Sequence, residues 1–415
     1  MEHRGRLEPE LDGEVVRSRL EASLLSDFRE ELVSLVVCTL GDLVTGSILG
    51  WGNFIIAVFP ALMVLIPGAA GMRGNVYSSL GSRIGTLLHL GVVEPKFKRQ
   101  PRLMENVRAS FTLVISINFY LGVLAGLLAR WIGLKASVVD LAAVAVFAAV
   151  LSMVFLMPAV FVVAFLTFRK GLDPDNFSAP MITLIGDLVT LPTLFLAAYL
   201  VLLTGSSLKL IFLAIAAALS CYLAFKAVRA KKESLKILKE STPVLLLCGF
   251  LEVFAGFILG SQVEELLAVA GVLTVLPAFL EDNGALASVL AAKLATRLHA
   301  GIILPQSKPG GFTLRMFLVN HAVAAVIFPV IAAMGYAVSF ILKLKAPSLP
   351  LLMFSLFTAG MLTVLLANIA AYYVSVLAYR KGVDPDNVSI PLLTSTIDLM
   401  GAGILVAVFL LLKVI

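Results

Sequence analysis

Charge is scarce in this sequence. Only 14% of its 415 residues are charged, whereas 60% are hydrophobic, and a soluble domain carries about 25% charged residues. Apolar runs of roughly 20 residues, the length needed to cross a bilayer, recur along the chain without the alternation of barrel strands. The shortage of charge excludes a soluble protein, and the runs predict an all-α polytopic membrane protein.

Cysteine is scarce as well. Cys38, Cys221 and Cys248 are the only cysteines, all three lie in apolar runs, and no CxxC spacing indicates a metal clip or a redox pair. Phosphate loops, nucleophile elbows and zinc spacings are also missing. We therefore expect no enzyme, and we look for function among the few polar residues inside the apolar runs.

Basic residues form no extended patch. The formal net charge is +6, but the basic residues cluster in short loops between apolar runs, for example in residues 94–102 and 226–239. Such clusters mark the cytoplasmic side of a membrane protein, so we expect no nucleic-acid partner. Residues 1–31, the only long polar stretch, hold more acidic than basic residues, unlike a signal peptide. They predict a cytoplasmic N-terminal tail.

What the chain does contain is a duplication. The stretch "GLDPDNFSAPMITLIGDLV" from Gly171 returns as "GVDPDNVSIPLLTSTIDLM" from Gly382, a spacing of 211 (171 to 382). Elsewhere "GDLVTGSILG" from Gly41 matches "LEVFAGFILG" from Leu251 at a spacing of 210 (41 to 251). Several separated blocks in nearly constant register indicate two repeats of one structural unit.

The number of spans in each repeat predicts how the two halves face. Each half shows five apolar spans, an odd number, so two adjoining halves would be inverted relative to one another. The apolar run 208–228 has no counterpart and adds one span. We therefore predict two parallel five-helix repeats joined by an extra linker transmembrane helix, about 11 spans in all, with a pseudo-two-fold axis along the membrane normal.

This reading divides the chain into four parts and sets its orientation. The N-terminus lies in the cytoplasm, the C-terminus lies outside, and the protein is a multi-pass protein of the cell membrane. The predicted parts are a tail at 1–31, a first membrane repeat at 32–206, a linker helix with a basic cytoplasmic loop at 207–240, and a second membrane repeat at 241–415.

Each repeat places one aspartate deep in its last span. Asp-Pro is a helix start, and Asp187 follows Pro174 by 13 residues (174 to 187), or roughly 20 Å along the helix at about 1.5 Å per residue. Asp398 follows Pro385 in the same way. A carboxylate in hydrocarbon costs about 2.5 kcal/mol or more and is a functional candidate by default. No cationic partner is apparent for either aspartate.

The residues around these aspartates predict a hard cation. Thr183 and Thr394 lie four residues before Asp187 and Asp398, hence on the same helical faces. Two parallel halves would bring the two oxygen-bearing faces together around one axis. Magnesium is usually held by one or two carboxylates with several waters retained, which suits this set better than calcium. The alternative is that each aspartate hydrogen-bonds a neighbouring helix as polar glue.

Further polar residues repeat less faithfully. Asp42 and Glu252 form a second acidic pair, which could be an ion entrance or could bond a threonine hydroxyl. Asn75 could supply a pore oxygen or pack helices. Glu281 and Asp282 have no charged counterparts in the first repeat and could break the symmetry of the site.

These motifs resemble a known family. The stretches "PALMVLIPGAAGMRGNVYSSLGSRIGT", "DPDNFSAPMITLIGDLVTL" and "DPDNVSIPLLTSTIDLMG" resemble the MgtE-type divalent cation transporters, especially the animal solute-carrier relatives in which two such units are fused. The resemblance covers roughly residues 35–415. It implies pore aspartates at Asp187 and Asp398, and it places the family's GxxGN element on Gly71, Gly74 and Asn75.

Three functions remain open. The first is magnesium transport through a pore between the repeats, with manganese or cobalt as competing ions; the second is a sodium- or proton-coupled divalent cation exchanger; the third is a membrane assembly protein without transport. The expected partners are the divalent ion and the lipid bilayer. An oligomer is not required, because the two repeats form a pseudo-dimer.

Overall fold

The structure, a computed structural model, describes residues 13–170, 174–230, 233–381 and 390–415. The described chain is helical and holds no strand. Its elements are α1 (Gly13–Trp51), α2 (Asn53–Val58), α3 (Leu62–His89), α4 (Pro101–Trp131), α5 (Val138–Arg169), α6 (Pro174–Leu203), α7 (Ser206–Ala230), α8 (Glu233–Gly260), α9 (Val263–Ala268), a 3₁₀ turn η1 (Ala270–Thr274), α10 (Leu276–His299), α11 (Gly311–Ile341), α12 (Leu349–Lys381) and α13 (Ile390–Leu411).

Ten helical segments in the described ranges are long and apolar enough to cross a membrane. They lie in α1, α4 to α8 and α10 to α13, and the segment in α1 begins at Glu31. Helix α3 is 28 residues long, but Arg73, Asn75 and Arg83 lower its hydropathy. The prediction of an all-α polytopic membrane protein is confirmed, and the predicted count of about 11 spans is reached when α3 is included.

Helix boundaries follow the predicted register. Helix α2 spans Asn53–Val58, and α9 spans Val263–Ala268, a shift of 210 at both ends (53 to 263, 58 to 268). The same shift relates α4 to α11. Helix α6 begins at Pro174, as the Asp-Pro motif predicts, whereas the matching start at Pro385 lies outside the described residues. Helix α1 runs without a break through residue 31, the predicted end of the tail.

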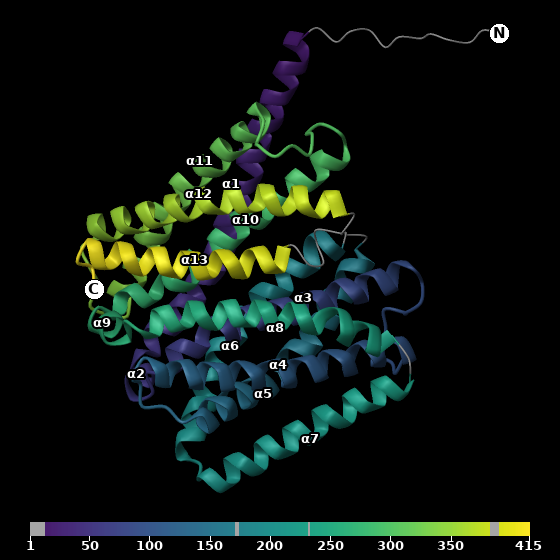
Figure 1. Cartoon of the computed structure of the whole chain (residues 1–415), viewed down its shortest axis with the longest axis vertical. Helices are drawn as coiled ribbons and strands as arrows, with labels where there is room; N and C mark the ends of the chain where they lie inside the picture. Colours follow the sequence, from purple (N-terminus) through teal and green to yellow (C-terminus); the bar gives the residue numbers. More distant parts are fainter. Residues whose placement is uncertain (1–12, 171–173, 231–232, 382–389) are drawn as a thin grey trace, which may run out of the picture.

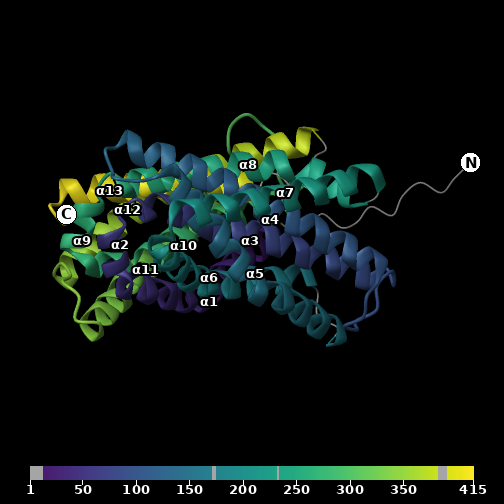
Figure 2. The same ribbon diagram turned by 90° about the horizontal axis from the view of Figure 1, so that it is seen from below.

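The two halves are parallel. The equivalent helices α2 and α9 lie at the same edge of the molecule, beside the C-terminus, in two perpendicular views (Figures 1 and 2). At this edge Gly50, near the end of α1, lies against Leu342 and Leu344 of the α11–α12 loop. An inverted second half would place that loop at the opposite edge. The unmatched helix α7 packs on α4 and α5 at the flank of the first half (Figure 1).

The halves exchange their first helices. Helix α1 packs on α10 and α11 of the second half, and α8 packs on α3 and α4 of the first; Figure 1 shows α8 between α13 and α4. Gly46 of α1 lies directly against the backbone carbonyl of Thr274, and Gly256 of α8 lies against that of Val64. Gly46 and Gly256 are 210 residues apart (46 to 256), and so are Val64 and Thr274 (64 to 274). The two contacts are therefore equivalent, and the exchange is reciprocal. Small residues permit such close helix approach in membranes.

Candidate cation site

Equivalent residues of both halves line one cavity between them. Its volume is about 60 Å³, which is enough for several water molecules because a cavity needs roughly 10–15 Å³ to hold one. Six equivalent pairs line it: Leu49 and Leu259, Ile66 and Leu276, Pro67 and Pro277, Ala70 and Leu280, Gly71 and Glu281, and Asp187 and Asp398. The cavity therefore lies where the pseudo-two-fold axis passes between the repeats.

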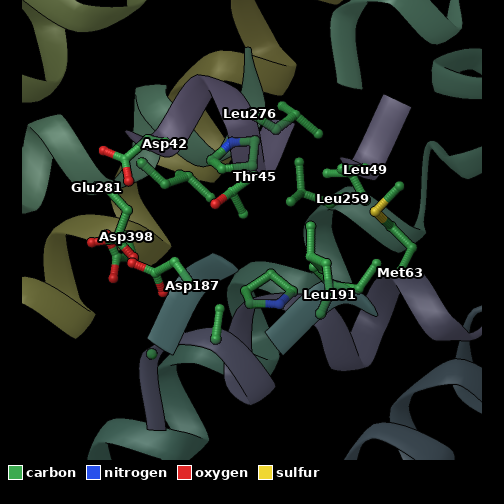
Figure 3. A pocket seen from close by; sticks show the side chains of 16 residues that line it. Asp42, Thr45, Leu49, Met63, Asp187, Leu191, Leu259, Leu276, Glu281 and Asp398 are labelled. Atoms are coloured by element: carbon green, nitrogen blue, oxygen red, sulfur yellow. The ribbon is translucent and has the colours of Figure 1, made fainter. Parts of the chain in front are cut away.

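The cavity has an acidic end and an apolar end. Figure 3 shows the side chains of Asp42, Asp187, Glu281 and Asp398 gathered on one side. Leucines and Met63 line the opposite side (Figure 3). The four carboxylates come from α1, α6, α10 and α13, so four helices converge on the acidic end.

Asp187 and Asp398 face each other across this acidic end. Asp187 is 5% exposed, Asp398 is half-buried, and neither accepts a hydrogen bond from the part of the chain that the structure describes. Asp187 is close enough to Glu281, Asp42 and Asp398 to interact with their charges. Such repulsion is strong in a low-dielectric site, and a bound cation would relieve it.

The carboxylates share one side of the cavity but do not converge on a single point. In the described ranges no group of three His, Cys, Asp or Glu side chains is placed to hold a metal ion directly.

The structure places the two members of the second acidic pair, Asp42 and Glu252, in different surroundings. Asp42 lines the cavity. Glu252 does not: its Oε1 accepts a hydrogen bond of 2.8 Å from the Ser395 hydroxyl, and its carboxyl group packs against Gly71 so closely that a Cβ there would collide with it. Its Oε2 is buried and has no partner among the described residues.

Glu281 is a cavity residue absent from the predicted ligand set, although it was named as a possible source of asymmetry. It occupies the position of Gly71 in the second repeat, as the sequence contrast of "GMRG" with "EDNG" indicates. Because Gly71 has no side chain, Glu252 folds onto α3, whereas Glu281 reaches into the cavity. The Thr39 hydroxyl donates to Oδ2 of the neighbouring Asp282 at 2.6 Å, whereas Asp282 Oδ1 is buried and has no partner among the described residues.

The remaining predicted residues lie beside the cavity and do not line it. Thr183 faces Gly74 of α3, and Thr394 faces Gly284 of α10, with the nearest threonine atoms about 3.5 Å from where a Cβ on either glycine would lie. The Thr394 hydroxyl donates to the Pro391 carbonyl at 3.0 Å. Asn75 is half-buried on α3, one turn beyond Gly71.

One basic residue does lie near Asp187, contrary to the sequence analysis. Arg73 of α3 is 1% exposed, and its charge interacts with that of Asp187. It was missed because it belongs to a different helix from Asp187, and sequence alone does not show which helices are neighbours.

Comparison with known proteins agrees with the geometry. The family model MgtE, described as "Divalent cation transporter", matches residues 66–197 and 276–408, one segment in each half. The rat protein named Solute carrier family 41 member 3 is 26% identical over 426 residues, covering 94% of this chain and 88% of the rat protein. The human protein named Solute carrier family 41 member 2 is 24% identical over 370 residues, covering 84% of this chain and 63% of the human protein. No solved structure matches the chain. The two family matches cover more than half of the chain, and this protein belongs to the MgtE family of divalent cation transporters.

Proposed function

We propose that this protein carries magnesium across the membrane between its two repeats, with the ion held by Asp187 and Asp398. One observation carries the proposal: two equivalent carboxylates share an intramembrane cavity, and neither accepts a hydrogen bond from the described chain. Unpartnered carboxylates at membrane depth need a cation or another polar partner. Membership in a divalent cation transporter family supports a doubly charged ion.

The ion is held largely through its own waters. Magnesium dehydrates reluctantly and usually keeps several waters when one or two carboxylates bind it. The cavity has room for such waters. We assign Thr183, Thr394 and Asn75 to the path beyond the aspartates, because the two threonines share a helical face with them. Manganese and cobalt compete, since both bind oxygen ligands at least as well.

The surplus of carboxylates supports the coupled exchanger as a second candidate. Asp42 and Glu281 line the cavity besides the two aspartates, so one divalent ion would leave negative charge uncompensated. A sodium ion or protons could balance it. Flux that accelerates with an opposing sodium or proton gradient would favour the exchanger, and flux that ignores both gradients would favour the channel.

The orientation remains as proposed from sequence. The N-terminal tail 1–31 and the linker loop lie in the cytoplasm, and the C-terminus lies outside the cell membrane. Exposed Lys96, Lys98 and Arg99 in the α3–α4 loop, and Arg380 and Lys381 at the end of α12, support it. The pseudo-dimer closed by the exchanged helices makes a further subunit unnecessary.

Magnesium flux into proteoliposomes tests the assignment. Asp187→Asn and Asp398→Asn each remove one charge without creating a cavity, so each should lower flux at least about tenfold, because the ion loses a charged partner at short range. Glu264→Gln, which removes a charge from an exposed side chain of α9, is the matched control and should leave flux unchanged. Wild-type flux in the double aspartate variant would refute the site.

A further inference from the structure

Arg73 is a buried cation with unused donors. Its Nη1 donates to the Thr193 hydroxyl of α6 at 3.3 Å. Nε and Nη2 are buried and have no hydrogen-bond partner in the described chain. A buried guanidinium is expensive unless it is paired and hydrogen-bonded, so one neutral hydroxyl does not account for an arginine at this place.

The carboxylate whose charge acts on Arg73 is Asp187, although no ion pair joins the two side chains in the described chain. Thr193, which holds the guanidinium, lies on the same helix as Asp187, and the charges of Arg73 and Asp187 interact. Asp187 in turn accepts no hydrogen bond from the described residues. The planar fork of an arginine matches a carboxylate with two parallel N–H donors. The unused donors and the unused acceptor are therefore complementary.

This cation is present in one repeat only. The position of Arg73 is taken in the second repeat by Asn283 (73 to 283), whose Nδ2 donates to the Phe279 carbonyl of its own helix at 2.7 Å. Glu281, which takes the position of Gly71 in the second repeat (71 to 281), adds negative charge within range of both aspartates. Asp187 thus has a buried cation nearby that Asp398 lacks, although the two aspartates are equivalent by sequence.

We propose that Arg73 is a built-in cation that competes with the transported ion for Asp187, so that the ion is held chiefly from the second repeat by Asp398 and Glu281. This inference rests on the proposed function and adds a division of roles between the two halves. With the cavity empty, the charge of Arg73 acts on Asp187 without a direct ion pair between them. An arriving divalent ion must bind Asp187 against the repulsion of this buried cation, and the same repulsion helps the ion to leave.

Isothermal titration of the purified full chain with magnesium chloride tests this competition. Arg73→Asn installs the residue of the second repeat and removes the competing cation. Magnesium should then bind about tenfold more tightly, because the repulsion between a buried positive charge and a doubly charged ion is removed. Arg73→Lys keeps the charge and should restore the wild-type affinity. In an Asp187→Asn background, Arg73→Asn should change the affinity much less, because the contested carboxylate is gone.

A structural role for Arg73 gives a different pattern. If Arg73 only joins α3 to α6, then Arg73→Asn and Thr193→Val should both lower the unfolding temperature, and magnesium affinity should stay the same; that result overturns the proposal.

A second comparison decides the matter even if Arg73→Asn does not fold. The proposal expects Asp398→Asn to weaken magnesium binding about tenfold more than Asp187→Asn, and equal losses would overturn it. Failure of the wild-type chain to bind magnesium at all would instead remove the proposed function itself.

Discussion

A glycine decides where Glu252 points. At the residue scale the two acidic positions of the first spans are related by sequence, yet only Asp42 reaches the cavity. The missing side chain at Gly71 leaves a space on α3 that the Glu252 carboxyl fills, and Ser395 completes its environment. One small residue in one repeat is enough to give equivalent carboxylates different partners.

Replacing this glycine should destabilise the protein. In Gly71→Ala the new Cβ would collide with the Glu252 carboxyl and would drive it from the Ser395 hydroxyl. Leaving a buried carboxylate without its bond costs about 1–3 kcal/mol, so we expect a lower unfolding temperature in detergent. Gly74→Ala is the control, because the nearest atom there would be 3.5 Å from the new Cβ. Equal unfolding temperatures for both variants would contradict this packing.

At the scale of elements, the exchange of α1 and α8 joins the halves. Each exchanged helix packs on two helices of the other half, so the cavity walls on both sides include a helix from the opposite repeat. The linker helix α7 is held differently: Lys209 bonds Asp140 of α5 at 2.8 Å, and Ser220 bonds Ser116 of α4 at 2.6 Å. Those contacts stay within the first half.

A large residue at the exchange contact should separate the helices. Gly256→Leu would place a side chain against the Val64 carbonyl, a backbone atom that cannot turn away. Such overpacking costs about 1–3 kcal/mol or more, and it should lower both the unfolding temperature and magnesium flux, because α8 borders the cavity through Leu259. In the control Gly403→Ala the nearest atom is a side-chain methyl group, Ile258 Cδ1, at 3.7 Å. Unchanged stability in Gly256→Leu would show that α8 does not lie this close to α3.

At the scale of the whole molecule, the sequence predicted the features that follow from the duplication. The constant spacing predicted two matching sets of long helices, the unmatched run predicted α7, and the shared motif predicted equivalent places for Asp187 and Asp398, which the structure puts on one cavity. The short helices α2 and α9 were not predicted. The exchange of first helices was not predictable, because a half with its own first helix in place shows the same apolar pattern. The proximity of Arg73 to Asp187 was not predictable either, because it depends on which helices pack side by side.

Parallel halves make a prediction about the two faces of the membrane. Lys135 and Lys345 occupy equivalent loops (135 to 345), as do Lys98 and Lys308 (98 to 308), and all four side chains are exposed. Cysteines placed singly at these positions, in a chain whose native cysteines are replaced, should react in matching pairs with a membrane-impermeant maleimide.

The positive-inside rule sets which pair reacts from which side. We expect Lys135→Cys and Lys345→Cys to be labelled in intact cells, and Lys98→Cys and Lys308→Cys only after the membrane is opened, because the α3–α4 loop carries exposed basic residues. Matching pairs with the sides reversed would overturn the orientation but keep the fold. If Lys135 and Lys345 reacted from opposite sides, the two repeats would be inverted, and Asp187 and Asp398 could not face each other across one axis along the membrane normal.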